Sequence, residues 1–396
     1  NCCNQGTVVN MRSKKRILFI NGHLNTGGVE RSLVDILKHM DYTKYDVDLL
    51  LLEDTGDYTS ELLPEVNVLF RDIHNTYGSF ASSIRRCIAA HDWMCLRLRF
   101  LFLLQKFWGA RVLKPAAAVL LGDYRCDCVI GFRRGVCSDL AAYSIQAERR
   151  ITWWHHGEFN VERAAYGDMC KRMNAVAVVS RACKDMLQGQ LPELVDKLIC
   201  IPNMLDTEAI KRKALRSPYT DNTLHVISVG HLMPEKHFEN IIPAAETLRE
   251  TGIEFKWHIV GEGPERARLE SLLAKSNLKD RVILEGSKTN PYPYIRYADL
   301  FVPPSYVESQ GLTVLEAMAL GIPCVVTKSR GPCEFIENGA NGLLTEQSPE
   351  SLTEKVLTIL NDKELYQRIR DNTKCPERFS PERVINQIET MIDGEK

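Results

Sequence analysis

Short apolar runs alternate along the chain with longer stretches in which apolar and polar residues follow a helical spacing. In the first half, the runs ILFI, VDLLLL, CVIGF, VAVVS and LICIP occupy residues 17–20, 47–52, 128–132, 176–180 and 198–202. Runs of this length and composition predict strands. Strands that alternate with helices predict a parallel sheet of the α/β class.

The same alternation begins a second time after a charged, turn-rich stretch. This stretch, DTEAIKRKALRSPYTDNT, covers residues 206–223 and is interpreted as a linker. The later runs VISVG, WHIVG, VILEG, LFVPP and PCVVT occupy residues 226–230, 257–261, 282–286, 300–304 and 323–327. A chain of 396 residues exceeds the ~250 to 300 residues at which single cores stop growing. We therefore expect two doubly wound, Rossmann-like domains with a ligand in the cleft between them, at the carboxyl ends of their strands.

These patterns also predict domain limits. The N-terminal domain covers residues 1–207 and the C-terminal domain residues 208–375. Residues 376–396 resemble a Ser-capped helix with proline at its first position, and we expect this helix to return to the N-terminal domain. Residues 1–10 are polar and lack the apolar core of a secretory signal, so they are interpreted as an upstream extension before Met11.

Composition narrows the class of protein. The 50 Lys and Arg residues against 51 Asp and Glu give a net charge of -1, so no nucleic-acid partner is expected. The 13 cysteines are scattered and odd in number, which favours reduced thiols in a cytoplasm. Cys126 and Cys128 have no second pair at zinc-finger spacing, so buried thiols are the preferred interpretation. The chain contains no run of about 18 apolar residues, the length that a helix needs to span a bilayer.

Each half opens with a glycine turn after its first strand. In NGHLNTGGVERSL, Gly27 and Gly28 would let the backbone approach a ligand before a helix that starts near Val29, although a plain tight turn is equally consistent. In SVGHLMPEKHFENI, Gly230 ends a strand and Lys236 precedes a helix. Such a lysine can neutralise a phosphate, whereas most surface lysines are only solvated.

Two glutamates flank an apolar run in YVESQGLTVLEAMALGIPCVV, residues 306–326. Glu308 lies in a polar loop, and Glu316 lies on a helix predicted from Leu312 to Leu320. One interpretation is a solvated helix face. However, a strand, a loop with Gly311 and a helix in this order direct free helical N–H groups to the carboxyl edge of a sheet. The segment therefore predicts half of a phosphate site.

Two further patterns contain residue types that occur in functional sites. His155 and His156 follow an apolar strand in ITWWHHGEF and could contact a substrate hydroxyl or carry a proton. From these residues alone, a structural pair beside two tryptophans is the preferred interpretation. Metal binding is less favoured, because no further ligand lies at suitable spacing. Asp46 and Asp48 form a D-x-D triplet of the kind that holds a divalent ion in some sugar-transfer enzymes, but their place at the start of a predicted strand favours an ordinary surface edge.

Several motifs in register resemble those of family 4 glycosyltransferases of the GT-B fold. The stretch VESQGLTVLEAMALGIPCVVT is similar to the E-x7-E signature of that family, with Glu308 and Glu316 at the acid positions. The resemblance extends over nearly the whole chain, through GGVER, AVVSRACKDML, IPN, VGHLMPEK, IVGEGPE, LEGSKTNPYPYIRYADLFVPPS and ENGANGLL.

The resemblance implies retaining sugar transfer from a UDP- or GDP-sugar, without a cofactor or an essential metal. Glu316 would bind the ribose, Glu308 the transferred sugar, and Lys236 with the N–H groups of Leu312 and Thr313 the diphosphate. The implied catalytic residues are His156, Glu308 and Lys236. The implied donor-binding residues are Gly27, Gly28, Gly230, His231, Lys236, Gly286, Glu308, Gly311, Leu312, Thr313 and Glu316.

Some of these assignments leave alternatives. His155 competes with His156, since a shift of one residue cannot be settled in so short a motif. The base would be recognised near residues 286–290, largely by backbone groups. The family usually has arginine where this chain has His231 and glycine where it has His237. His231 keeps open one rival function, a non-catalytic partner protein that retains the fold. A sugar-nucleotide epimerase of the same fold is the other rival.

Residues 82–114 form a basic region with interleaved aromatic side chains. The region carries seven Lys and Arg residues, at positions 85, 86, 97, 99, 106, 111 and 114, against Asp92. This pattern is typical of helices that lie on an anionic membrane surface. It is also consistent with helices that pack on the N-terminal domain and carry a basic rim. The membrane interpretation predicts a cytoplasmic enzyme on the inner face of the cell membrane. Its acceptor would be an oligosaccharide or a lipid-linked saccharide of cell-surface polysaccharide or glycolipid synthesis.

Overall fold

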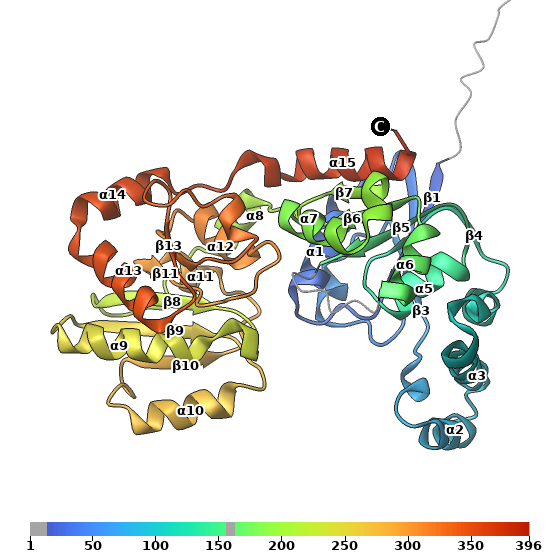
Figure 1. Cartoon of the computed structure of the whole chain (residues 1–396), viewed down its shortest axis with the longest axis horizontal. Coiled ribbons are helices and arrows are strands. Elements are labelled where there is room, and N and C mark those ends of the chain that lie inside the picture. Colours follow the sequence, from blue (N-terminus) through green and yellow to red (C-terminus); the bar gives the residue numbers. More distant parts are fainter. Residues whose placement is uncertain (1–13, 156–162, 396) are drawn as a thin grey trace, which may run out of the picture. The chain divides into compact units, whose positions relative to one another are not determined.

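The computed structural model describes residues 14–155 and 163–395. The chain forms two compact units (Figure 1). Unit 1 comprises residues 1–153 and 164–176, and unit 2 comprises residues 154–163 and 177–396. The predicted domain limits, and the predicted return of the C-terminal helix, stay predictions.

The first sheet is seven-stranded, with the order β3-β2-β1-β4-β5-β6-β7. Neighbouring strands from β3 to β5 pair in parallel, as predicted. On β1, Ile17, Leu18, Phe19 and Ile20 are all fully buried, which explains the continuous apolar run. The strands are β1 (Lys15–Asn21), β2 (Tyr45–Leu51), β3 (Val66–Phe70), β4 (Arg125–Gly131), β5 (Gln146–Trp154), β6 (Ala175–Val178) and β7 (Leu198–Cys200).

Helices connect these strands. The α-helices are α1 (Gly28–His39), α2 (Phe80–Ala89), α3 (Trp93–Trp108), α4 (Ala116–Leu121), α5 (Val136–Tyr143), α6 (Arg163–Lys171) and α7 (Arg181–Gln190). Short 3-10 turns are η1 (Asp57–Glu61), η2 (His74–Thr76), η3 (Ala110–Leu113) and η4 (Pro192–Lys197). The helix predicted to start near Val29 is α1, and Leu33, Val34, Ile36 and Leu37 form its buried face.

The second sheet has the order β10-β9-β8-β11, and all its pairings are parallel. Its strands are β8 (Leu224–Val229), β9 (Phe255–Val260), β10 (Val282–Gly286) and β11 (Leu300–Phe301). A separate parallel pair consists of β12 (Val325–Thr327) and β13 (Leu343–Thr345). A single bridge from Phe301 to Cys324 links β11 to the residues before β12.

The helices of this part of unit 2 are α8 (Thr207–Lys213), α9 (Ile241–Glu250), α10 (Arg266–Lys275), α11 (Tyr292–Arg296), α12 (Leu312–Ala319), α13 (Pro349–Asn361), α14 (Lys363–Asn372) and α15 (Pro381–Asp393). Its 3-10 turns are η5 (Pro234–Lys236), η6 (Phe238–Asn240), η7 (Pro332–Glu334) and η8 (Glu377–Phe379). Pro381 opens α15 as predicted, but the Ser380 side chain makes no capping hydrogen bond.

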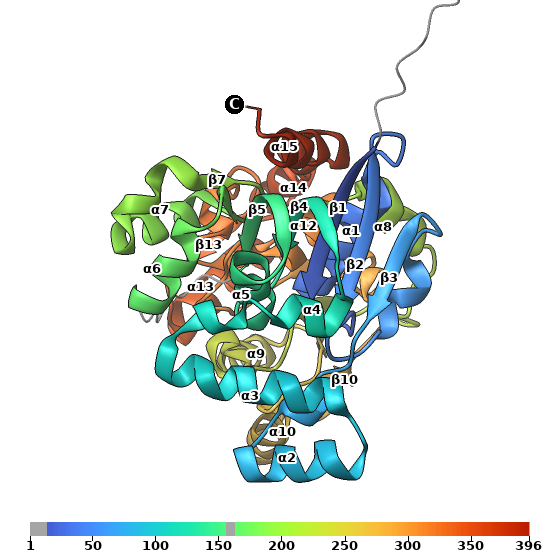
Figure 2. The same cartoon turned by 90° about the vertical axis from the view of Figure 1, so that its right-hand side faces the viewer.

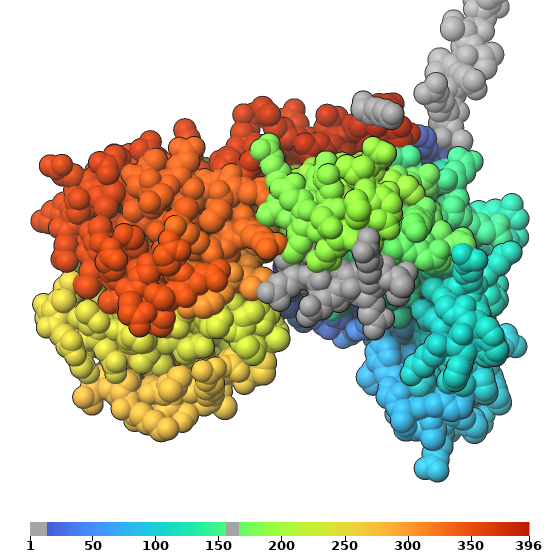
Figure 3. Space-filling view, in the orientation of Figure 1, coloured from blue at the N-terminus to red at the C-terminus, as the bar shows by residue number. Residues whose placement is uncertain are grey.

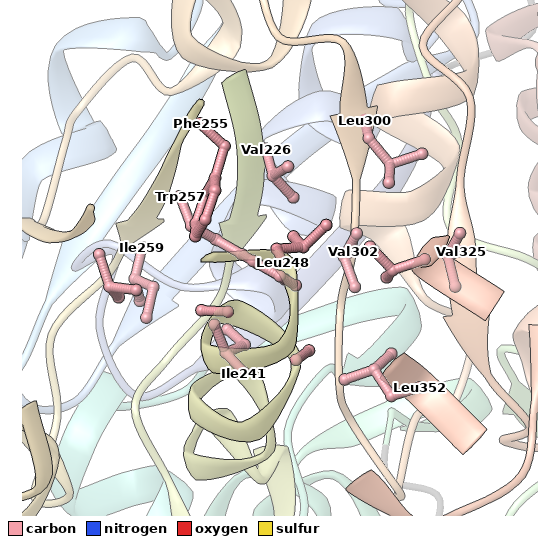
Figure 4. Packing of buried hydrophobic residues seen from close by; sticks show 14 of the residues in the cluster. Val226, Ile241, Leu248, Phe255, Trp257, Ile259, Leu300, Val302, Val325 and Leu352 are labelled. Carbon is pink, nitrogen blue, oxygen red and sulfur yellow. The ribbon is translucent and has the colours of Figure 1, made fainter. Parts of the chain in front are cut away.

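Alternate residues of the second sheet supply two cores, one on each face. Val226 and Trp257 pack with α9 and α13 in one cluster (Figure 4), whereas Ile227 and Val260 pack with α11 and α12 in another. Side chains alternate between faces with period two along a strand, so a sheet covered by helices on both faces needs apolar residues at consecutive positions. The doubly wound α/β prediction is therefore confirmed.

Three expectations from the sequence differ from the structure. The stretch interpreted as a linker contains α8, whose Ile210 is buried in a core of unit 2 with residues of α11 and α12. Asp48 is not at a surface edge, because its carboxylate is buried and accepts hydrogen bonds from Arg16 Nε at 2.8 Å, from Asn67 Nδ2 at 2.6 Å and from the Tyr124 hydroxyl. The basic run includes Arg99, which is also buried and donates to Ser83 Oγ at 2.7 Å.

Other features follow the sequence. All described cysteines are free thiols, and Cys126 and Cys128 are both buried. Within the described ranges, no helix is long and apolar enough to cross a membrane.

Candidate functional site

Lys236 and Glu308 form an ion pair in unit 2. Lys236 ends η5, and its Nζ donates to Glu308 Oε1 at 2.6 Å and to the Val307 carbonyl at 3.4 Å. The two side chains are 21% and 18% exposed, so the pair is largely shielded but still accessible. A charge-assisted hydrogen bond of this kind holds both groups in one geometry.

Backbone contacts fix the loop that carries Glu308. The Tyr306 N–H donates to the Glu235 carbonyl at 3.2 Å, which ties this loop to η5. The Gly331 N–H donates to the Glu308 carbonyl at 3.1 Å. A Cβ on Gly331 would lie only 2.5 Å from Gln310 Cα, so glycine is required for this close approach. The loop is therefore held from two sides.

Gly311 turns the chain from this loop into α12. It has φ of 83°, in the left-handed region, and a Cβ there would lie 2.7 Å from Pro332 Cγ. Its carbonyl accepts the N–H groups of Val314 and Leu315 at 3.1 and 3.2 Å. The preceding N–H groups, of Leu312 and Thr313, have no intrahelical acceptor. The positive end of the helix dipole adds to their attraction for an anion.

Glu316 lies on the same face of α12 as the side chains of Leu312 and Thr313. Val314, Leu315 and Ala317 are buried in the core, whereas Leu312, Thr313 and Glu316 are half-buried. Residues three and four apart share a helix face. The Tyr292 hydroxyl donates to Glu316 Oε1 at 3.4 Å. This part of unit 2 therefore carries a cation, helical N–H donors and two carboxylates on neighbouring segments.

Three more predicted residues follow strands of the second sheet. Gly230 follows β8, and a Cβ on it would lie 3.3 Å from the Phe238 ring. His231 is exposed. Gly286 ends β10 with φ of 73°, a backbone conformation that favours glycine. All three lie at carboxyl ends of strands, where α/β sheets bind ligands.

The remaining predicted residues are not part of this group in unit 2. Gly27 precedes α1 and Gly28 begins it, both in unit 1. His155 follows β5 and is half-buried. His156 lies outside the described residues. No group of three or more metal-ligating side chains that could hold an ion occurs between residues 14 and 155 or between 163 and 395.

Comparison with known proteins finds glycosyltransferases among the proteins to which this chain is similar. Residues 209–375 match the family model described as "Glycosyl transferases group 1". Alpha-D-kanosaminyltransferase of Streptomyces kanamyceticus is 34% identical over 214 residues, which cover 51% of this chain and 55% of the relative. N-acetyl-alpha-D-glucosaminyl L-malate synthase of Bacillus anthracis is 29% identical over 169 residues, which cover 42% of this chain and 44% of the relative. The chain thus spans about half the length of these relatives.

Solved structures extend the likeness to the whole fold. Anabaena Alr3699/HepE in complex with UDP-glucose superposes with a TM-score of 0.69 at 18% identity, over 96% of this chain and 100% of that chain. This chain has the GT-B fold. At such low identity the likeness concerns the fold alone, so the chemistry of the chain must be argued from its own residues.

Gln310 of this GT-B chain is not among the residues predicted from the sequence. Its side chain accepts from the Asn203 N–H at 2.7 Å and donates to the Asn203 carbonyl at 3.0 Å, and both residues are buried. These two hydrogen bonds fix Gln310, which lies between Glu308 and the start of α12. The motif IPN, which ends at Asn203, was the available signal, but its partner could not be read from the sequence.

A second missed feature is the conformation of His237. This residue has φ of 48°, one of two non-glycine residues with positive φ in the described ranges. The residue therefore adopts the conformation for which glycine is favoured. Its ring stacks on Tyr306 with centroids 3.8 Å apart, and Tyr306 accepts a hydrogen bond from Asn240 at 2.9 Å. His237, which directly follows Lys236, thus packs against the loop that carries Glu308.

A buried histidine pair lies within the second sheet of the GT-B chain. His225 Nδ1 is 3.1 Å from His258 Nε2, and His258 Nδ1 is 2.9 Å from Glu285 Oε1. Burial lowers the pKa of His258, although Glu285 acts in the opposite direction. Glu285 directly precedes Gly286, so this pair borders the predicted base-binding segment.

Proposed function

We propose that this GT-B chain is a retaining family 4 glycosyltransferase that moves a sugar from a UDP- or GDP-sugar to a saccharide acceptor. The ion pair between Lys236 and Glu308, next to the amino end of α12, is the observation that carries the proposal. Such a combination suits a sugar diphosphate, which presents two phosphates between two sugars. The match of residues 209–375 to a glycosyltransferase family supports it.

Lys236 and α12 would bind the diphosphate. The ammonium and the first N–H groups of α12 both attract anions. Charge on the diphosphate rises as the sugar leaves, so these fixed donors stabilise the transition state more than the bound donor. In this proposal the cation and the helix do the work that a divalent ion does elsewhere, and no metal is required.

The two glutamates would bind the sugars at either end of the diphosphate. Ionised carboxylates accept hydrogen bonds from two neighbouring hydroxyls. Glu316, on the exposed side of α12, would accept from the ribose, with Tyr292 orienting its carboxylate at 3.4 Å. Glu308 would accept from the transferred sugar while it stays paired with Lys236.

Transfer with retention would proceed on one face of the sugar. The bond from C1 to the phosphate oxygen breaks, the acceptor oxygen bonds to C1, and the acceptor proton passes to the leaving phosphate oxygen. His156 would contact the sugar or its phosphate in this proposal, and Gly27 and Gly28 would permit close backbone approach. No protein nucleophile is needed in this scheme.

The acceptor is proposed to be lipid-linked, on the inner face of the cell membrane. Helices α2 and α3 lie side by side in both views and project from unit 1 (Figures 1 and 2). Large apolar side chains are exposed here, with Trp93 at 59%, Phe107 at 72% and Trp108 at 67%. Figure 3 displays this blue to cyan part of the surface. Exposed arginines and lysines beside them, such as Arg97 and Lys106, favour anionic lipid.

Vesicle sedimentation tests the membrane part of the proposal. The protein should bind vesicles rich in phosphatidylglycerol and not vesicles of phosphatidylcholine alone. Replacing Phe107 and Trp108 with serine should weaken binding about tenfold or more, since both side chains are largely exposed. Leu215→Ser is the control, because Leu215 is 71% exposed in unit 2. If the double variant bound the anionic vesicles as well as the wild type does, the surface of α2 and α3 would be excluded as the membrane-binding surface.

An activity assay tests the transfer itself. Radiolabelled UDP- and GDP-sugars are incubated with the protein and a bacterial membrane lipid extract, and label in the lipid fraction is measured. One donor should label the lipid with retained anomeric configuration, and Glu308→Gln should reduce labelling at least a hundredfold. Isomerisation of the donor without an acceptor would instead indicate an epimerase.

A further inference from the structure

Three neighbouring strands of unit 1 end in the same way. The central strands of the first sheet are β2, β1 and β4, paired in parallel. His23, Glu53 and Arg133 each stand two residues beyond the end of one of them. The Glu53 N–H donates to the Gly22 carbonyl at 2.8 Å, and the Phe132 N–H donates to the Ile20 carbonyl at 3.0 Å. The strand register therefore brings the three side chains to one edge of the sheet.

These side chains form a charged cluster together with Glu30 of α1. Arg133 Nη1 is 2.8 Å from His23 Nε2 and 3.7 Å from Glu30 Oε1. A Cβ on Gly22 would lie 2.9 Å from Glu53 Oε1 and 3.2 Å from Arg133 Nη1, so Glu53 and Arg133 lie against the same glycine. Gly22 leaves room for both groups at this edge.

A tyrosine completes the edge cluster. Burial and a hydrogen bond to Glu53 raise the pKa of Tyr77, so its hydroxyl stays protonated and donates to that carboxylate. The exposed fraction is 40% for the Arg133 side chain but only 7% for Glu30. Arg133 and Tyr77, which is 38% exposed, are thus the most exposed members, and Glu53 is half-buried. The buried Glu30 pairs with Arg133.

A buried amide at the end of β1 has an unused acceptor. Asn21 is fully buried, and its Nδ2 donates to the His23 carbonyl at 2.7 Å. Its Oδ1 has no hydrogen-bond partner among the described residues. A buried acceptor without a partner is costly, and a bound hydroxyl or water commonly satisfies it. The unused acceptor lies at the same end of β1 as the edge cluster.

We infer that this edge cluster of unit 1 (His23, Glu30, Glu53, Tyr77 and Arg133) binds an uncharged sugar ring of the acceptor through its hydroxyls. The inference rests on the proposed function and names the acceptor-binding residues. A sugar hydroxyl donates and accepts at once, so it fits a site where a carboxylate acceptor lies beside a guanidinium donor. Arg133 donates to the ring, and Glu53 accepts from the adjacent hydroxyl.

The charge of the edge cluster selects against anionic groups. One arginine and two glutamates leave one net negative charge when His23 is neutral, and Arg133 donates to His23 Nε2 only when that nitrogen carries no proton. A phosphate or carboxylate at this position would meet net repulsion. The part of the acceptor that enters the edge cluster is therefore the neutral sugar and not a lipid phosphate.

Saturation-transfer NMR in the presence of UDP and GDP tests the inference. The probes are methyl glycosides of glucose, galactose, mannose and N-acetylglucosamine. At least one glycoside should give a transfer signal with the wild type. Glu53→Gln, which keeps the shape of the side chain, and Arg133→Lys should each reduce that signal at least threefold. Arg125→Ala is the control, because Arg125 is exposed at the opposite end of β4.

Nucleotide affinity, measured by calorimetry on the same proteins, separates the two proposals. Both cluster variants should bind nucleotide as the wild type does, since Lys236, Glu316 and the amino end of α12, which are proposed to bind the nucleotide, belong to unit 2. Unchanged glycoside signals in both variants, or no glycoside signal with a wild type that binds nucleotide, would overturn the edge cluster as the acceptor site. A folded wild type that binds no nucleotide would instead overturn the proposed function.

Discussion

The ring of His237 stacks on the ring of Tyr306 with an interplanar angle of 29°. His237 has positive φ, which costs a non-glycine residue about 1 kcal/mol or more. The stack offsets part of this cost, because aromatic pairs contribute about 0.5–1.5 kcal/mol. His237 thus adopts an unfavourable backbone conformation, and its stacking on Tyr306 compensates for part of the strain.

Two substitutions separate these effects. His237→Ala keeps the strain and loses the stack, so the free energy of unfolding should fall by about 1 kcal/mol. His237→Gly loses the stack but also the strain, so it should be more stable than His237→Ala by about 0.5–1 kcal/mol. Urea unfolding measures both variants. If the His237→Gly variant proved less stable than the His237→Ala variant, backbone strain at positive φ would not control the stability at this position.

Gly311 and Gly321 provide a matched pair for the geometry of α12. Both have positive φ, but a Cβ on Gly311 would meet Pro332 at 2.7 Å, whereas a Cβ on Gly321 would meet nothing within 4 Å. Gly321→Ala should therefore cost only about 1 kcal/mol of backbone strain. Gly311→Ala should cost more and displace the amino end of α12, so that nucleotide binding is lost. Calorimetric titration decides, and equal nucleotide affinity in the two variants would contradict this role for Gly311.

Lys236→Met tests the cation of the site. Methionine has similar length but no charge, so the variant should bind the cognate nucleoside diphosphate about tenfold more weakly, a loss of ~1.4 kcal/mol. Binding of the corresponding nucleoside, which lacks phosphate, should change little. Lys328→Met is the control, since Lys328 pairs with Glu346 and its side chain is 47% exposed. An equal loss for nucleoside and diphosphate would argue against a phosphate contact.

The histidine pair predicts a pH dependence of stability. Burial lowers the pKa of His258, with His225 and Lys256 acting in the same direction and Glu285 opposing them. Asp221 lies 3.2 Å from His225 Nε2 on the other side of the pair. The unfolded state takes up a proton near pH 6.5, and the folded state only at lower pH. Stability is therefore complete above about pH 6.5 and falls as the pH drops toward the folded-state pKa.

His258→Gln checks this dependence, because glutamine does not titrate. Urea unfolding between pH 7.5 and 5.5 should show a steeper loss of stability for the wild type than for the variant. Parallel losses over this range would mean that other groups control the acid sensitivity.

Much of the fold could be predicted from the sequence, because strands buried on both faces leave continuous apolar runs. The runs that became β1, β8 and β9 are examples, and their alternation with helices predicted the parallel sheets. Strand β3 was missed, since in VNVLF only Val66 is buried. Helix α8 was missed because its sequence is charged and only Ile210 is buried.

The candidate site was predictable only where a motif carries it. The sequence singled out Lys236 and Glu308, and the structure brings them to 2.6 Å. Contacts between distant segments, such as Gln310 with Asn203, leave no local pattern. The edge cluster had a signal that went unused, namely a polar residue two positions after each of three strands. It becomes evident only when the strand order makes those strands neighbours.

The central claim is that unit 2 binds a nucleotide through Glu316 and the amino end of α12. Isothermal titration with UDP, GDP, ADP and their sugars tests it most directly, on the wild type, Glu316→Ala and the control Glu354→Ala, whose carboxylate is exposed on α13. We predict that one nucleotide binds the wild type and the control equally and binds Glu316→Ala at least tenfold more weakly. A folded wild type that binds none of them, or a Glu316→Ala variant with unchanged affinity, would contradict the claim.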